Sequence, residues 1–273
     1  MVTQEQRKRQ LAREKFLRQQ QRRTAARRKS RMRNSVIASV LGVILIGSVA
    51  LYTTGVLKDD DKSNASSETT PSAAASSKAP TDPCDKAAAG SVKKLSWKKE
   101  PAVSIDKSAK YTMTLATTCG DIGIALKTAA APHTVNSFDF LAGKGFFDHT
   151  KCHRLTTNGI YVLQCGDPAG SGSGGPGYTI PDENLKDTSL KGGVYPAGTV
   201  AMANTGQKHT GGSQFFLVYQ DSQLPASYTP FGTISDSGMK VLKKIAAAGE
   251  NTGAGDGAPN ATVVINKATV TKS

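Results

Sequence analysis

The chain has 273 residues, of which 38% are hydrophobic, and a formal net charge of +14, so it has room for one or two domains. The charge is uneven, because residues 1–33 hold thirteen Lys and Arg against two acidic residues and the rest is close to neutral. The basic overall charge therefore gives no reason to expect nucleic-acid binding by the folded part. Only the tail, residues 1–33, is expected to contact anionic lipid.

Residues 34–57 are predicted to form a transmembrane signal-anchor helix. Val36 to Leu57 is a run of 22 uncharged residues, long enough to cross the bilayer core. The Lys and Arg residues precede this run, so the N-terminus is predicted to be cytoplasmic and the remainder extracytoplasmic, in a single-pass protein of the cell membrane. The alternative is a signal peptide that is cleaved near Ala50 and releases a secreted protein.

Residues 58–100 are predicted to be a linker. The stretch is rich in Ser, Ala and Pro, a composition that cannot bury a core and is typical of disordered spacers. Its last part carries the single tryptophan, Trp97, which we expect at the edge of the domain that follows. That domain is predicted to span residues 101–273.

The pattern of residues 101–273 is mainly that of short β-strands. Strands are predicted at 111–118, 122–126, 194–203, 214–219 and 261–270, with helices starting at Pro132 and after Ser235. Many short strands with two helices predict a closed β-barrel that is capped by the helices.

The segment Cys152–Asp167, CHRLTTNGIYVLQCGD, predicts a tight pair of antiparallel strands. Apolar residues flank a short loop that contains glycine, which is the pattern of a β-hairpin. Such a hairpin would bring Arg154 and Gln164 together on one face.

Several other features restrict the chemistry. Four cysteines, at positions 84, 119, 152 and 165, form no C-x-x-C pair, and outside the membrane they permit two disulfides in any of three pairings. The glycine loop 170–177 is followed by prolines rather than a helix, so it does not predict nucleotide binding. No acid-rich frame surrounds the histidines, and no metal or cofactor is expected.

Motifs in the globular part resemble the cyclophilin family of peptidyl-prolyl cis-trans isomerases, in a bacterial membrane-anchored, extracytoplasmic form. The motifs, in order, are 132–138 (PHTVNSF), 147–154 (FDHTKCHR), 164–167 (QCGD) with 172–175 (GSGG), 202–204 (MAN) with 212–216 (GSQFF), and 231–232 (FG). The resemblance implies a closed eight-stranded antiparallel barrel with two capping helices. It also implies a monomeric isomerase, or rotamase, that needs no cofactor and acts on X–Pro bonds of exported proteins to assist their folding.

The resemblance also assigns roles to residues. Arg154 matches the catalytic arginine, and Gln164 is the amide beside it. Gln223 stands where many eukaryotic members have Trp, and Tyr228 stands where many have His. The residues that match the substrate-binding positions are Tyr161, Val162, Ala203, Asn204, Gln214, Phe216, Gln223, Leu224 and Tyr228.

The chemistry of these residues agrees with this role, because a fixed guanidinium can stabilise a twisted prolyl amide without a covalent intermediate. Two alternatives remain open at this point. The groove could hold proline-containing polypeptides with little turnover. The barrel could also be a passive ectodomain of a membrane protein whose basic tail recruits cytoplasmic partners.

Overall fold

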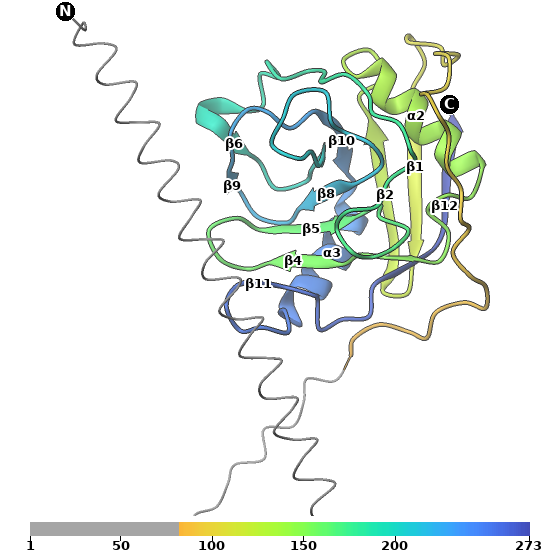
Figure 1. Ribbon diagram of the computed structural model, residues 1–273. Helices are drawn as coiled ribbons and strands as arrows, with labels where there is room; N and C mark the ends of the chain where they lie inside the picture. The colour runs from red at the N-terminus through yellow and green to blue at the C-terminus, as the bar shows by residue number, and fades with distance from the viewer. Residues whose placement is uncertain (1–81) are drawn as a thin grey trace, which may run out of the picture. The chain divides into compact units, whose positions relative to one another are not determined.

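The structure, a computed structural model, describes residues 82–273. The predicted basic tail, the predicted membrane span and the linker up to residue 81 lie outside the described residues. Within residues 82–273, no helix has the length and apolar character needed to cross a bilayer. Figure 1 shows this part of the chain in colour, from orange at its first residues to blue at the C-terminus.

The described part is mainly β, as predicted. It contains twelve strands, two α-helices and one short 3₁₀ helix. The strands are β1 (Tyr111–Thr117), β2 (Gly120–Leu126), β3 (Thr150–Lys151), β4 (Arg154–Thr156), β5 (Val162–Cys165), β6 (Val194–Tyr195), β7 (Thr199–Met202), β8 (Phe215–Val218), β9 (Ser222–Gln223), β10 (Pro230–Ile234), β11 (Asp256–Gly257) and β12 (Val264–Lys272). The helices are α2 (Pro132–Gly143), α3 (Asp236–Ala247) and η1 (Lys191–Gly193).

The sheet is an open half-barrel, so the prediction of a closed eight-stranded barrel is wrong. Ten strands form one sheet in the order β11-β4-β5-β8-β7-β10-β2-β1-β12-β3, and β6 pairs with β9 in a second sheet. β3 and β11 are the two edge strands of this sheet, and they do not pair with each other. β3 pairs with β12, whereas β4 pairs with β5 and β11, and Cys152 and His153 between them belong to neither strand.

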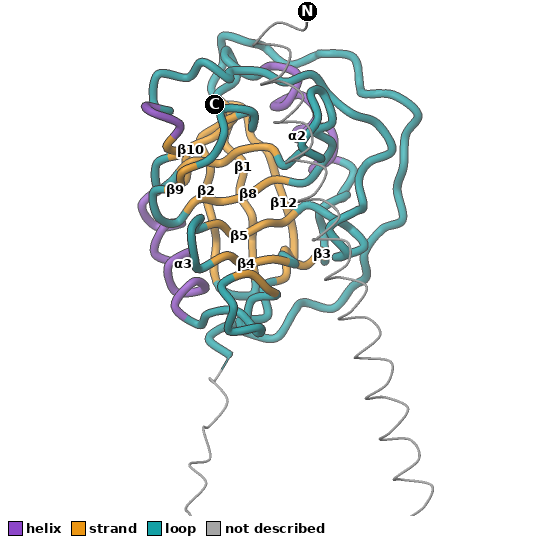
Figure 2. The backbone as a smooth tube through the Cα atoms, turned by 60° about the vertical axis from the view of Figure 1, so that its left-hand side comes forward, coloured by secondary structure: helices purple, strands orange, loops and turns teal. Residues whose placement is uncertain are grey.

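The two α-helices lie on different sides of the sheet (Figure 2). α2 packs against β12, and α3 packs against β2. On α2, the fully buried Phe138 contacts Phe147, Phe215 and Phe231, with ring centroids 5.3, 5.4 and 4.5 Å apart. These aromatic contacts join α2 to β8, which carries Phe215, and to β10, which carries Phe231.

Both helices begin where the sequence predicts. Pro132 occupies the first turn of α2, where its missing N–H costs no hydrogen bond. The Glu183 carboxylate accepts the backbone N–H groups of His133 and Thr134 at 3.0 and 2.9 Å, which satisfies donors that a helix start leaves open. Ser235 caps α3 by accepting the N–H of Gly238.

Residues 82–100, here called the strap, lie against the folded domain. The strap runs along one side of the domain past α2 (Figure 1). One disulfide joins Cys84 of the strap to Cys119 in the turn between β1 and β2. Trp97 packs edge-on against Phe140 of α2 at 5.0 Å. The folded part of the chain therefore begins before Pro101.

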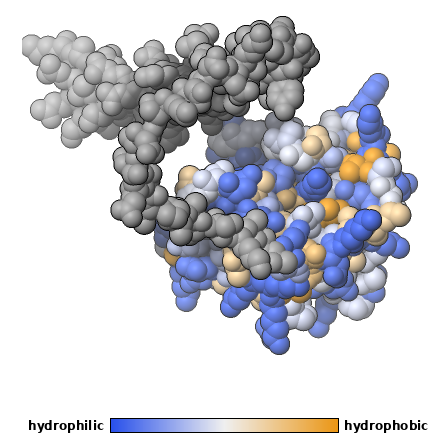
Figure 3. All heavy atoms as spheres, turned by 90° about the horizontal axis from the view of Figure 1, so that it is seen from below, coloured by the Kyte–Doolittle hydropathy of each residue, from blue (hydrophilic) through white to orange (hydrophobic). Residues whose placement is uncertain are grey.

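The surface gives little indication of a binding face. The side shown in Figure 3 is largely hydrophilic, with only scattered apolar residues. Among residues 82–273, Val103 is the one large hydrophobic residue that is exposed, at 37%. The site is therefore identified from cavities and polar clusters rather than from an apolar patch.

Candidate active site

Arg154 and Gln164 lie opposite each other on neighbouring strands. In the antiparallel pair β4–β5, Arg154 pairs with Gln164 and Leu155 pairs with Leu163. Gly159 lies in the turn with a φ of 75°, a conformation that favours glycine. The predicted hairpin and the predicted closeness of these two side chains are confirmed.

Asp256 on β11 holds the guanidinium of Arg154. Nε and Nη2 of Arg154 donate to Oδ1 and Oδ2 of Asp256 at 2.6 and 2.7 Å, which is the bidentate arrangement of a strong ion pair. The hydrogen bond between them is the main reason that the pKa of Arg154 is raised and that of Asp256 is lowered. Both groups are therefore charged at neutral pH.

Arg154 keeps two N–H groups for a ligand. A guanidinium has five N–H donors, of which two bond to Asp256 and one, on Nη1, bonds to Oε1 of Gln164 at 3.2 Å. The other two have no protein partner within residues 82–273. Because 38% of the Arg154 side chain is exposed, these donors are accessible to a ligand.

A chain of hydrogen-bonded side-chain amides continues from Arg154 toward the glycine loop, residues 170–177. Since Oε1 of Gln164 faces the guanidinium, its Nε2 donates to Oε1 of Gln214 at 2.8 Å. Nε2 of Gln214 in turn donates to the carbonyl oxygen of Gly174 at 2.9 Å. These bonds fix the orientation of both amides and connect β11 to the glycine loop.

Beside this chain lies a small cavity of about 180 Å³. Its lining residues are Arg154, Ile160, Val162, Gln164, Ala203, Asn204, Phe216, Leu224 and Tyr228. The lining thus combines one cation and two amides with an apolar wall, a composition suited to an apolar ring next to a polar backbone.

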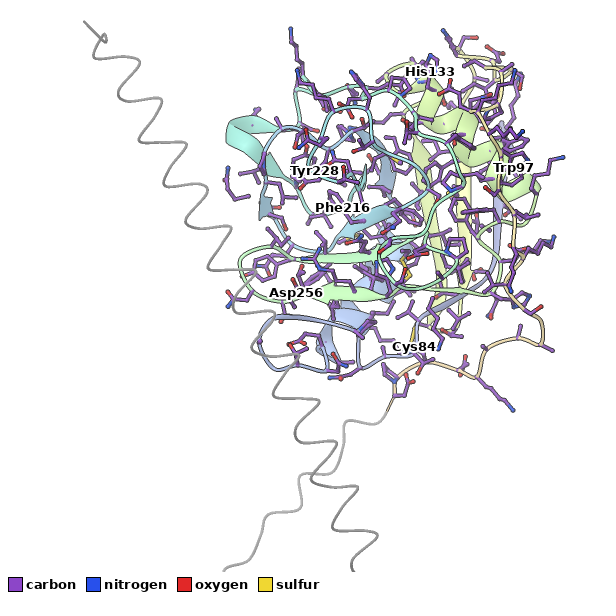
Figure 4. All side chains as sticks on the ribbon, in the orientation of Figure 1. Cys84, Trp97, His133, Phe216, Tyr228 and Asp256 are labelled. Carbon is purple, nitrogen blue, oxygen red and sulfur yellow. A yellow bond between two sulfur atoms is a disulfide. The ribbon has the colours of Figure 1, made fainter. Side chains whose placement is uncertain are left out.

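The floor of the small cavity is a second apolar cluster, separate from the main core, which contains Val162, Tyr195, Ala201, Phe216 and Val218. Phe216 and Tyr228 lie side by side, with ring centroids 5.4 Å apart (Figure 4). The Tyr195 hydroxyl donates to the carbonyl oxygen of Tyr228 at 2.8 Å and accepts its N–H at 3.2 Å. Burial raises the pKa of Tyr195 to about 12, so this hydroxyl stays neutral and holds Tyr228 in place.

A second, larger cavity of about 910 Å³ adjoins the small one. Both are lined by Gln164, Ala203 and Asn204. The other walls of the large cavity come from the strap at residues 98–100, the loop 172–179, and residues 205, 210 and 212–214. One extended polypeptide can therefore occupy both cavities.

The glycine loop encloses a buried carboxylate of the chain itself. Asp167 is fully buried and accepts backbone N–H groups from Ala169, Gly172 and Gly174 at 2.7, 2.7 and 3.1 Å. Burial alone would raise the pKa of Asp167, but these N–H donors outweigh it and lower the pKa. An internal anion thus occupies the N–H groups that would otherwise suggest a phosphate site.

The two adjoining cavities are together called the groove, and most of the predicted site residues line it. Eight of them line the small cavity together with Ile160, and Gln214 lines the large one. Tyr161 lines neither and packs against Tyr219, with centroids 5.9 Å apart. Gln223, on β9, also lies outside both linings and donates to the carbonyl oxygen of Gly192 at 2.8 Å.

Two residues of the site, Ile160 in the cavity lining and Asp256 behind Arg154, were not predicted. Side chains alternate along a strand, so counting back from Gln164 puts Val162 and Ile160 on the groove face and Tyr161 on the other. Strand alternation was therefore a usable signal for Ile160. Asp256 gave no such signal, because it lies 102 residues from Arg154, on a two-residue strand within a segment rich in glycine.

In residues 82–273, no group of three or more His, Cys, Asp or Glu side chains is arranged to hold a metal ion. The groups near the small cavity that can act on a substrate are the guanidinium of Arg154, the amides of Gln164 and Asn204, and the ring of Tyr228. They can donate hydrogen bonds and enclose an apolar ring.

Comparison with known proteins identifies relatives over the same residues. Residues 112–270 match the family described as cyclophilin type peptidyl-prolyl cis-trans isomerase/CLD. A Mycobacterium leprae protein named "Probable peptidyl-prolyl cis-trans isomerase B" is 52% identical over 165 residues, 58% of this chain and 56% of that protein. A protein of the same name from Mycobacterium tuberculosis is 49% identical over 165 residues, covering 58% and 53%.

The chain thus spans about half the length of these two curated relatives. A solved structure, a cyclophilin type peptidyl-prolyl cis-trans isomerase from Cryptosporidium parvum, is 24% identical. It covers 60% of this chain and 99% of its own chain, with a TM-score of 0.49.

Proposed function

Because this chain belongs to the cyclophilin type peptidyl-prolyl cis-trans isomerase family, we propose that it catalyses cis-trans isomerisation of X–Pro bonds in polypeptides. The observation that carries the proposal is the position of Arg154. Two of its N–H groups have no protein partner within residues 82–273, and its side chain lines a cavity of about 180 Å³ with an apolar floor. The names of the two mycobacterial relatives support the same activity.

The reaction needs a group that binds the twisted amide more tightly than the planar one. Rotation about the X–Pro bond breaks amide resonance and has a barrier of about 18–20 kcal/mol. In the twisted state the prolyl nitrogen regains a lone pair and becomes a hydrogen-bond acceptor. A donor fixed beside it then bonds more strongly as rotation proceeds, which is the condition for catalysis.

The residues of the groove divide this task. Arg154 donates to the prolyl nitrogen or the adjacent carbonyl, and Asp256 and Gln164 keep its planar fork in place. Phe216, Leu224 and Val162 hold the proline ring while the rest of the polypeptide turns. The amides of Gln164 and Asn204 lie where they can bond the polypeptide backbone.

The test is the rate of cis-trans exchange in a peptide with one Ala-Pro bond, measured by NMR exchange spectroscopy with catalytic amounts of the full chain. Uncatalysed exchange takes roughly 10–100 s at 25 °C, so catalysis appears as exchange cross-peaks that are absent without protein. If the peptide binds in the groove without faster exchange, the proposed activity is wrong and the groove is a binding site.

We also propose that the clients are exported proteins and that residues 34–57 anchor the chain in the membrane. The uncharged run and the preceding basic residues support this proposal, as do two disulfides, which persist in oxidising compartments. Protease added to intact cells, after removal of any wall, should cut the linker and release a folded fragment. A domain that is protected until lysis would contradict this topology.

A further inference from the structure

The strap forms a fixed wall of the large cavity. Trp97 packs against Phe140 and Phe146, with ring centroids 5.0 and 6.1 Å apart, and the backbone N–H of Trp97 donates to the carbonyl oxygen of Pro176 at 2.8 Å. This bond joins the strap to the adjacent loop 172–179. Lys98, Lys99 and Glu100 follow directly and line the cavity. They precede residues 112–270, the part that matches the family, so this wall lies outside the matched residues.

The formal net charge of this wall is +1, from Lys98 and Lys99 against Glu100. Oε1 of Glu100 is 2.8 Å from Nδ1 of His133, so a hydrogen bond holds the one carboxylate of this wall at the start of α2. Lys98 and Lys99 are exposed and form no ion pair within residues 82–273. The buried carboxylate of the neighbouring loop, Asp167, is occupied by backbone N–H groups.

The remaining walls of the large cavity are uncharged. They consist of glycines, Ser173 and Thr179 of the loop, and Thr205, Thr210 and Gln214 across from it. An acidic side chain in this cavity would therefore meet two ammonium groups and one carboxylate, which is hydrogen-bonded to His133. A basic side chain would meet repulsion instead.

We propose that the large cavity selects polypeptides with an Asp or Glu close in sequence to the isomerised proline. The inference rests on the proposed function, because the proline in the small cavity fixes the distance to Lys98 and Lys99. The two cavities share Gln164, Ala203 and Asn204, so a bound chain passes directly from one to the other.

The expected preference is moderate, because exposed ion pairs contribute little and are screened by salt. A Glu peptide should have a kcat/KM about 5-fold above that of its Gln counterpart, which corresponds to about 1 kcal/mol. A Lys peptide should be poorer than the Gln peptide. The difference should decrease as the salt concentration rises.

The experiment uses the full chain and a set of hexapeptides with one Ala-Pro bond. Glu, Gln or Lys is placed at each position on either side of the Ala-Pro pair, and exchange rates are measured by NMR and Kd by calorimetry. The test variant is Lys98→Gln with Lys99→Gln. The control is Lys86→Gln with Lys94→Gln, which removes the same charge from exposed strap residues outside the cavity lining.

The inference predicts that Glu is preferred at one position, that the test variant loses this preference, and that the control keeps it. Equal kcat/KM and Kd for the Glu, Gln and Lys peptides would overturn it and leave the isomerase activity intact. Equal loss in both variants would overturn it as well, because overall charge would then explain the preference. If no peptide is isomerised, the proposed function fails, and Kd alone decides whether the cavity prefers acids.

Discussion

The small cavity is built partly on strands, whereas the large cavity lies mainly between loops and the strap. β4, β5 and β8 supply Arg154, Val162, Gln164 and Phe216 to the small one, and a buried cluster supports them from below. The large one is bounded mainly by the strap, the loop 172–179 and the segment 203–214. Atoms on packed strands are held more precisely than atoms on loops.

This difference assigns the two tasks of the proposed enzyme. Transition-state stabilisation requires donors that do not reorganise, and the small cavity provides them. Selection among polypeptides requires only a moderate difference in affinity, which flexible lysines on a strap can provide. Changes to the strap should therefore affect selectivity, and changes to the strands should affect turnover.

The largest expected effect follows removal of the disulfide that tethers the strap. Cys84→Ser with Cys119→Ser opens a loop of 35 residues, and the chain-entropy rule predicts a loss of up to about 4 kcal/mol in the free energy of unfolding. Urea denaturation measures this loss. Turnover of a neutral peptide should stay close to that of the wild type, because no wall of the small cavity comes from the strap.

The matched control removes the other disulfide. Cys152 and Cys165 flank the pair formed by Arg154 and Gln164, and their loop spans 13 residues. The same rule predicts a loss of about 3 kcal/mol for the double Ser variant. Here turnover of the neutral peptide should fall as well. Similar turnover in the two double variants would remove the distinction between the cavities.

The next effect concerns the reacting group itself. Arg154→Ala should lower kcat/KM by about 10²-fold, or about 2.7 kcal/mol, because it removes the donors that face the proline. Folding should persist, since Arg154 and Asp256 are 38% and 54% exposed and exposed pairs contribute little to stability. Circular dichroism and the exchange assay measure the two outcomes.

Arg154→Lys serves as the control for charge. It keeps the cation but loses the planar fork that donates to Asp256 and Gln164 at the same time. We therefore expect activity only slightly above that of the Ala variant. Turnover near that of the wild type in the Ala variant would contradict the proposed role of Arg154.

Much of the strand-built region could be predicted from the sequence. Apolar residues on both sides of a glycine turn are a local signal, and the hairpin has the expected pairing of Arg154 with Gln164. The helix starts at Pro132 and Ser235 were also readable, because they depend on the chemistry of one or two residues. The resemblance to the family then led to most of the cavity lining.

The remaining features depend on contacts between distant segments. The pairing of Asp256 with Arg154 crosses 102 residues, and β11 is only two residues long, too short for a periodic signal. Cysteine spacing did not choose among three pairings, and the structure joins Cys84 to Cys119 and Cys152 to Cys165. The break between β3 and β4, which leaves the half-barrel open, involves only two residues.

A smaller effect is expected from the partner of Arg154. Asp256→Asn should lower kcat/KM about 10-fold, or about 1.4 kcal/mol, mainly through kcat, because the guanidinium loses its bidentate acceptor and changes orientation. The control is Asp121→Asn, an exposed acid on β2 outside both cavity linings. Unchanged kinetics of the Asp256 variant would show that Gln164 alone positions Arg154.

The pH dependence follows from the same pair. The bond with Arg154 lowers the pKa of Asp256 below 3.8, so the carboxylate contributes fully above its unfolded pKa of about 3.9. That contribution is lost only as pH falls through the lower folded pKa. The ratio of wild-type to Asn-variant activity should therefore be constant from about pH 5 to about pH 8 and should decrease only in stronger acid.

The smallest effect tests which residues before β5 face the groove. Ile160 lines the small cavity, whereas Tyr161 contacts Tyr219 on the other face. Ile160→Ala should raise KM by about 5-fold, because it removes part of the apolar wall against the proline ring, worth about 1 kcal/mol for a half-buried side chain. Tyr161→Ala should leave KM unchanged and reduce stability slightly, since an edge-on aromatic pair contributes about 0.5–1.5 kcal/mol. Steady-state kinetics of the two variants decide the matter, and a larger rise in KM for the Tyr161 variant would contradict this assignment of faces.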